Sequence, residues 1–169
     1  MFKTDDTVFY GVHGVCRITG IVTKDFLGST ADYYVLIPVF ENRSTVFVPV
    51  DKPELVKKMR PLLSKDEIEE VIRSMPLCEE IWIEDEPTRK EVYAELLKSG
   101  DRIRLISLIK TLRNRKLSLG GKNRKMHACD ERFLDDALKM LHDEIAYVLE
   151  IERSQVASYI TETIGAEKM

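Results

Sequence analysis

The chain has 169 residues, of which 44% are hydrophobic and 33% charged, and its formal net charge is −3. This length suits one ordinary domain or two small ones, and the hydrophobic content supports a real core. No stretch approaches the roughly 18 consecutive apolar residues of a membrane span, and the first residues lack the apolar region of a signal peptide, which favours a soluble, cytoplasmic protein without a membrane partner. The three cysteines lie far apart and never approach C-x-x-C spacing, so neither a disulfide framework nor a zinc site is indicated.

The first third of the chain has the pattern of a small β module. Short runs rich in β-branched and aromatic residues alternate with turn residues; the runs are 7–10, 15–18, 21–22, 33–37 and 44–48. Five strands in about 45 residues cannot form a wide sheet that is covered on both faces, so we predict a tightly bent antiparallel barrel of the SH3 or Tudor type. Such barrels bind partners through an exposed edge or groove and rarely catalyse reactions.

A connection and a helix follow. Three prolines between positions 49 and 61 block a long helix or a central strand. Ser64 and Glu67 have the spacing of a capping box, in which each side chain bonds the backbone amide of the other residue, so a helix is predicted to begin there and to end at Pro76. We divide the chain into a β module at residues 1–52, a linker at 53–63 and a helical domain at 64–169.

The second half is predicted to be wholly helical, which gives an α+β protein with an all-helical C-terminal domain. Apolar residues recur at helical spacing in segments near 88–98, 102–114, 130–149 and 154–164. Gly100 is expected to adopt the left-handed conformation that ends the first of these helices, and Asp101 to cap the second. So short a joint predicts an antiparallel helical hairpin.

Positive charge is concentrated in this hairpin. Residues 89–125 contain twelve Lys and Arg against three acidic residues, a local charge of +9, whereas residues 64–87 carry −7. A chain that is acidic overall but gathers cations in one hairpin favours a polyanionic partner, most commonly nucleic acid. The alternative is an ordinary solvated face rich in Lys and Arg, and the charge alone leaves both open.

Catalytic and cofactor chemistry finds no support. The Gly120-Gly121-Lys122 sequence lacks the spacing, the Ser or Thr and the preceding strand of a phosphate-binding loop. His127 and His142 are too far apart for a metal-binding pair on one helix, and no nucleophile is paired with a base. We therefore expect no catalytic residue, no metal, no cofactor and no small-molecule substrate.

Trp82 is the only tryptophan. It stands in an acidic stretch just before the basic hairpin, and two interpretations are open. In the first it fills the core of the helical domain. In the second it is an exposed wedge or stacking group for nucleic acid.

The chain resembles the CarD and CdnL transcription regulators of bacteria, whose N-terminal module is shared with the transcription-repair coupling factor. The resemblance covers nearly the whole chain. Its motifs are Asp6-Thr7-Val8-Phe9-Tyr10, His13-Gly14-Val15, Tyr34-Val35-Leu36, Val48-Pro49-Val50-Asp51-Lys52 and Leu97-Lys98-Ser99-Gly100-Asp101.

The resemblance implies a non-enzymatic factor with two partners. In that family the Tudor-like module binds a lobe of the RNA polymerase β subunit, and the helical domain touches promoter DNA at the upstream edge of the melted bubble. A polymerase-contacting basic position of the family falls at Lys24, while another falls at Phe47 and is lost. The DNA-wedging tryptophan of the family falls at Glu86, four residues after Trp82.

From these observations we expect a transcription regulator that stabilises the open promoter complex. Docking would use an exposed edge strand, at residues 33–37 or 44–48. The expected polymerase-binding residues are Lys24, Tyr34 and Phe47. The expected DNA-binding residues are Trp82, Arg89 and Lys90, with the cations on phosphates, without sequence specificity. The protein would be cytoplasmic and reach the nucleoid through polymerase, with its oligomeric state open and a monomer favoured. The alternative is a protein-interaction adaptor with a Tudor-like module and no direct DNA binding.

Overall fold

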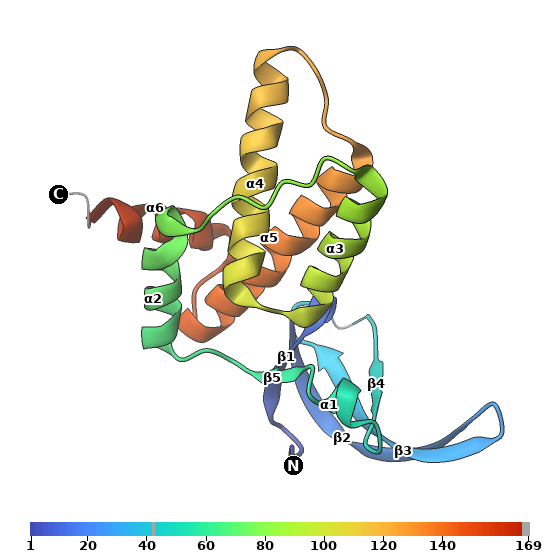
Figure 1. The fold of residues 1–169 in the computed structure, drawn as a ribbon. Coiled ribbons are helices and arrows are strands. Elements are labelled where there is room, and N and C mark those ends of the chain that lie inside the picture. Colours follow the sequence, from blue (N-terminus) through green and yellow to red (C-terminus); the bar gives the residue numbers. More distant parts are fainter. Residues whose placement is uncertain (42, 167–169) are drawn as a thin grey trace.

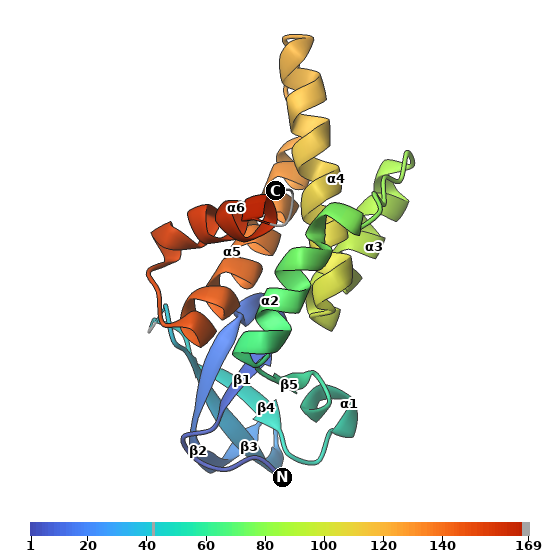
Figure 2. The same cartoon turned by 90° about the vertical axis from the view of Figure 1, so that its left-hand side faces the viewer.

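The computed structural model describes residues 1–41 and 43–166, and it places a β sheet at one end of a helical bundle (Figures 1 and 2). The strands are β1 (Thr7–Tyr10), β2 (Val15–Phe26), β3 (Ser29–Pro38), β4 (Val46–Pro49) and β5 (Met59–Pro61). The helices are α1 (Pro53–Val56), α2 (Lys65–Ser74), α3 (Glu86–Ser99), α4 (Arg102–Gly121), α5 (Ala128–Leu149) and α6 (Val156–Ala166). Short 3₁₀ turns are η1 (Gly11–His13), η2 (Met75–Leu77) and η3 (Arg153–Gln155). The predicted α+β class is confirmed.

The sheet is antiparallel and open. Its strand order is β4-β3-β2-β1-β5, so that β4 and β5 form its two edges and, among the described residues, do not pair with each other to close a barrel. The two strands expected at residues 15–22 are one long strand, β2, which is interrupted by an irregularity between Ile18 and Gly20. Strand β5 lies in the segment expected to be a linker and pairs with β1. The β2–β3 hairpin extends as an arm beyond the rest of the sheet (Figure 1).

The alternation of side chains along β1 links the sheet to the helices. Val8 points into the core of the sheet with Tyr34 and Leu36, whereas Phe9, its neighbour, is buried in the helical core. Because successive side chains of a strand point to opposite faces, one strand thus contributes to two cores. The turn η1, which follows β1, packs against α3 and α5.

The predicted local signals of the helical half are present. Ser64 and Glu67 form the capping box at the start of α2. Gly100 has φ of +64° after α3, and the Asp101 carboxylate accepts a hydrogen bond from the backbone amide of Arg104 at the start of α4. None of the described helices is long and apolar enough to cross a membrane.

A buried ion pair holds the connection between β5 and α2 against the bundle. Arg102 on α4 donates to Glu144 on α5 at 2.6 and 3.0 Å, and the side chains are 10% and 1% exposed. Arg102 also donates to the carbonyl of Pro61, and Glu144 accepts from the backbone amide of Leu63. This cluster fixes where the chain leaves the sheet and enters the helices.

Candidate nucleic-acid interface

Trp82 lies in an extended segment that crosses α4 between η2 and α3. The segment is held on one side of Trp82 by Ile81, whose amide donates to Thr111 Oγ1 at 2.8 Å and whose carbonyl accepts from the hydroxyl of Tyr93 at 2.8 Å. The indole is half-buried: it packs against the helical core, and its Nε1 donates to Glu84 Oε1 at 2.9 Å. Trp82 is therefore neither fully buried, as a core residue would be, nor fully exposed, as a wedge for nucleic acid would be.

Arg89 lies beneath this segment and is only 3% exposed. Its guanidinium donates to both carboxylate oxygens of Asp130 on α5, at 3.1 Å each, and to the backbone carbonyls of Ile83 and Glu84 at 3.0 and 3.3 Å. The guanidinium carbon also stands 4.5 Å from the centre of the Trp82 ring. We expected Arg89 on a phosphate, but its donors face the protein interior, where they position Trp82.

Lys90, the next residue, is exposed but paired. Its Nζ lies 2.7 Å from Glu86 Oε1, one helical turn earlier, and the hydrogen bond from Lys90 holds the pKa of Glu86 below its ordinary value. The family's wedge position is thus occupied by a carboxylate whose partner is the cation expected to contact DNA.

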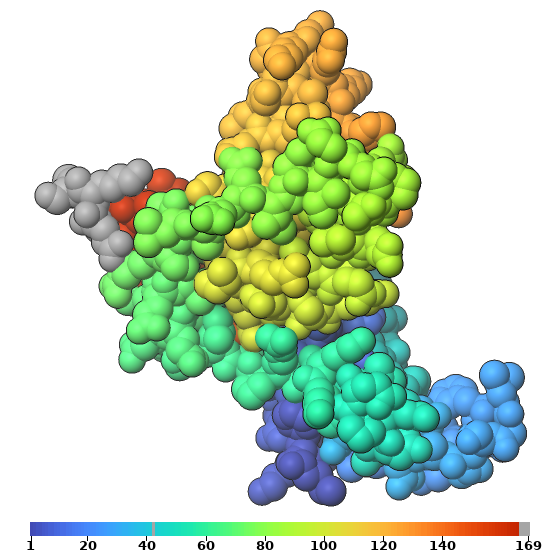
Figure 3. All heavy atoms as spheres, in the orientation of Figure 1, coloured from blue at the N-terminus to red at the C-terminus, as the bar shows by residue number. Residues whose placement is uncertain are grey.

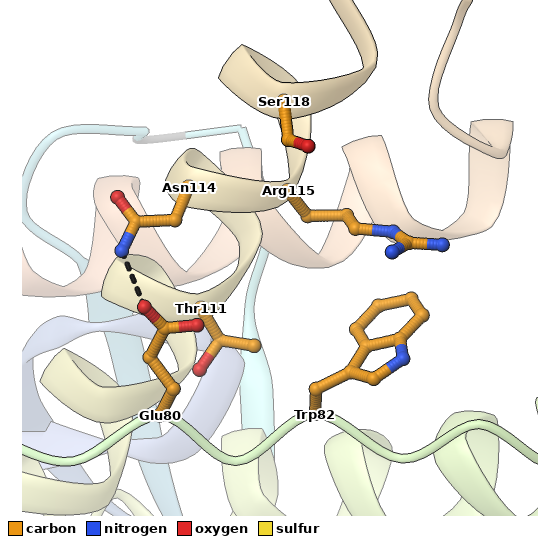
Figure 4. A pocket seen from close by; sticks show the side chains of 6 residues that line it. All are labelled: Glu80, Trp82, Thr111, Asn114, Arg115 and Ser118. Atoms are coloured by element: carbon orange, nitrogen blue, oxygen red, sulfur yellow. Dashed lines mark hydrogen bonds between the residues drawn. The ribbon is translucent and has the colours of Figure 1, made fainter.

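Arg115 on α4 covers Trp82 from the other helix. Its guanidinium carbon lies 4.4 Å from the ring centre, and among the described residues no carboxylate lies within ion-pair distance of it. Beside this stack is a hollow of about 320 Å³, which Figure 4 shows; it is lined by Glu80, Trp82, Thr111, Asn114, Arg115 and Ser118. A second hollow, of about 270 Å³, includes Arg89 and extends to Arg124 and Lys125.

Beyond its last buried residue, Leu112, α4 leaves the bundle and projects as a knob with the loop that follows (Figure 3). We call residues 113–125 the basic arm. It contains six cations and no acidic residue. All six are exposed: Arg113, Arg115, Lys116, Lys122, Arg124 and Lys125. Among the described residues only Lys116 of these pairs with a carboxylate, that of Glu131 at 3.7 Å. This concentration favours phosphate more strongly than the start of α3 does.

The expected polymerase-binding residues separate into surface and core. Phe47 on β4 belongs to an aromatic patch with Phe26 and Tyr33, whose ring centres lie 5.2 to 6.4 Å apart. Lys24 is exposed, and its Nζ lies 4.0 Å from the centre of the Phe47 ring. Tyr34 is only 2% exposed and faces the core of the sheet. Unlike Lys24 and Phe47, Tyr34 is therefore a core residue, contrary to the expectation that it contacts a partner.

The strand edges narrow the docking alternatives. Residues 33–36 of β3 pair with β2 on one side and with β4 on the other. That stretch therefore has no free edge for an added strand, contrary to one of our two expectations. Strand β4, which overlaps the other expected stretch, is an edge of the sheet.

Comparisons with known proteins identify the family of both parts of the chain. Residues 2–63 match the family described as CarD-like/TRCF RID domain, and residues 84–161 match the family described as CarD, C-terminal domain. The first range includes β5, and the second begins two residues after Trp82. The chain is also similar to the protein named "Putative transcription factor YdeB" of Bacillus subtilis (strain 168). The two are 24% identical over 159 residues, which cover 94% of this chain and 99% of that protein.

Proposed function

The chain belongs to the CarD family, and on that premise we propose that it is a non-enzymatic transcription regulator that docks on the β subunit of RNA polymerase and stabilises the open promoter complex. The coarser part of this statement, a transcription regulator with a polymerase-interacting domain, follows from the two family matches. The subunit, the DNA contacts and the effect on the open complex are the proposal.

The docking surface we propose combines the free edge of β4 with the aromatic patch beside it. An edge strand offers unpaired backbone groups to a strand of a partner. The patch of Phe26, Tyr33 and Phe47 adds apolar contact area, and Lys24 adds one charge above it. Because Lys24 lies over an aromatic ring, docking here should depend less on ionic strength than a purely ionic contact would.

The DNA contacts we propose lie on the helical bundle, toward the end that is away from the sheet (Figure 1). The observation that carries this part is that a partly buried tryptophan, exposed on one side, stands at the foot of an arm with six exposed cations. The cations would neutralise phosphates without reading sequence, and Trp82 would contact the bases where the duplex is already weakened.

The adaptor alternative would have the basic hairpin bind either the acidic segment of the same chain or an acidic partner. The structure bears on the first of these two forms. Such contacts exist at the start of α3, between Glu86 and Lys90, and at Glu80, which accepts from Asn114. The Glu80 bond reaches Asn114 in the basic arm. Among the described residues, however, none of the arm's six cations pairs with a carboxylate of residues 64–87, and Lys116 pairs with Glu131 instead. The charge of the arm therefore remains open to an external polyanion.

Retention of purified RNA polymerase on the immobilised full-length chain tests the docking part. The wild type should retain polymerase, and Phe47→Glu should release it because a carboxylate replaces the centre of the aromatic patch. Leu117→Glu is the matched control, since Leu117 is also an exposed apolar residue, at 75%, but lies on the basic arm. Equal retention by both variants would place the docking surface elsewhere, and failure of the wild type to bind polymerase would refute the proposal.

A further inference from the structure

The two guanidinium groups on Trp82 differ in their freedom. Arg89 is buried and bonded to Asp130 and to two backbone carbonyls, so it cannot move without breaking a buried ion pair. Arg115 is exposed and, among the described residues, contacts the ring without a carboxylate partner. One contact with the indole is therefore fixed, whereas the other is held only by a cation–π interaction.

The hollow beside Arg115 has groups suited to the edge of a flat ring. Asn114 and Ser118 stand at exposed positions of α4. Figure 4 shows Asn114 turned toward Glu80, to which its amide nitrogen donates, and Arg115 extended the other way over the Trp82 ring. The carbonyl of Asn114 and the hydroxyl of Ser118 remain for the edge of a ligand. Its volume of about 320 Å³ is at the small end of ligand sites, which limits the occupant to one ring system. The carboxylate of Glu80 at its margin repels phosphate. One of its oxygens accepts from Asn114, and the other can accept a hydrogen bond from an amino group of a base.

We propose that this hollow receives a single unpaired nucleobase of melted DNA, which stacks on Trp82 after Arg115 moves aside and then lies between the indole and the guanidinium. Bases of single strands are commonly held by stacking on aromatic rings and Arg planes and by hydrogen bonds to their edges. The strand's phosphates would remain outside, on the basic arm. The inference rests on the proposed DNA contact and specifies its form, which is capture of a base and not insertion between base pairs.

Because Trp82 is the only tryptophan, its fluorescence reports on this site alone. We would titrate the full-length protein with a short poly-thymidine strand and with a strand of equal length and charge in which every base is missing. Binding of both is followed by the anisotropy of a fluorescein label on the DNA, and stacking by quenching of the indole emission with unlabelled strands. We expect both strands to bind, the strand with bases about five- to 150-fold more tightly, and only that strand to quench the emission.

A matched pair of variants tests the role of Arg115. Arg115→Gln removes the guanidinium that covers the base and should remove most of the difference in affinity between the two strands. Arg104→Gln is the control: it lies on the same face of α4, three turns or about 16 Å away, is exposed, and should preserve that difference.

The outcomes separate this inference from the proposed function. Equal quenching or equal affinity for the two strands would overturn the base site and leave phosphate binding by the arm intact. Loss of the base preference in Arg104→Gln as much as in Arg115→Gln would also overturn it. If neither strand binds even at low salt, the base site and the proposed DNA contact both fail.

Discussion

Replacing Arg89 by Met should destabilise the protein strongly and have only an indirect effect on DNA binding. The side chains of Arg89 and Asp130 are 4% and 2% exposed, and Met retains much of the aliphatic volume while removing every donor. Breaking a buried ion pair by removing one partner typically costs about 3 to 5 kcal/mol, because the remaining charge stays buried without compensation. The carbonyls of Ile83 and Glu84 would lose their donor as well.

Urea unfolding followed by circular dichroism measures this cost. The midpoint should fall in Arg89→Met with little change in slope. The double variant Arg89→Met with Asp130→Asn should be less destabilised than the sum of the two single variants, since neither charge is then left alone. Lys90→Met is the control at the adjacent position, and its exposed pair with Glu86 should contribute little to stability.

The opposite pattern would refute this reasoning. If Arg89→Met were as stable as Lys90→Met and instead lowered DNA affinity with a reduced salt slope, Arg89 would be a phosphate contact, as the sequence suggested. Reduced binding with an unchanged salt slope fits the structure, because Trp82 would then have lost its support.

Three further substitutions test the turn between α3 and α4, a buried carboxylate on α5 and the Arg102–Glu144 ion pair. Gly100→Val should destabilise the folded protein by about 1 kcal/mol or more, since φ is +64° and a Cβ would lie 3.1 Å from Phe9 Cε1. An unchanged melting temperature would contradict this. Burial raises the pKa of Asp143 from 3.8 to about 6, so the folded state binds this proton more tightly. From pH 4 to 6 the wild type should therefore lose about 1 to 2 kcal/mol of stability relative to Asp143→Asn, after allowance for solvent screening. If the difference in unfolding free energy between the two proteins stayed constant over this range, the pKa of Asp143 would not be raised by folding. Glu144→Gln should speed hydrogen exchange at the amide of Leu63, which donates a hydrogen bond to the Glu144 carboxylate. Unchanged protection of that amide would show that the Arg102–Glu144 ion pair is not needed to hold this connection.

Local signals were predictable from the sequence because their partners are close in the chain. The capping box of Ser64 and Glu67 and the joint at Gly100 and Asp101 each span a few residues, and both formed as predicted. Strand β5 was missed because three residues that end in a proline carry no periodicity, and only the pairing with β1 makes them a strand.

The candidate site was predictable in composition but not in geometry. The sequence identified Trp82 and the cationic hairpin, yet it assigned Arg89 to the surface because its partner, Asp130, is 41 residues away. The basic arm was hidden for a different reason. We expected α4 to end near Asn114, whereas it continues to Gly121, since no helix breaker precedes the glycine pair. That continuation moves the exposed charge away from α3.

The lifetime of open promoter complexes tests the central proposal most directly. Complexes formed by purified RNA polymerase on a promoter fragment would be challenged with heparin, and their decay followed without the protein, with the wild type and with Trp82→Ala. The account predicts the longest lifetime with the wild type and a shorter one with Trp82→Ala, while both proteins remain bound to polymerase. A lifetime that the wild type does not extend, or that Trp82→Ala extends equally, would contradict it.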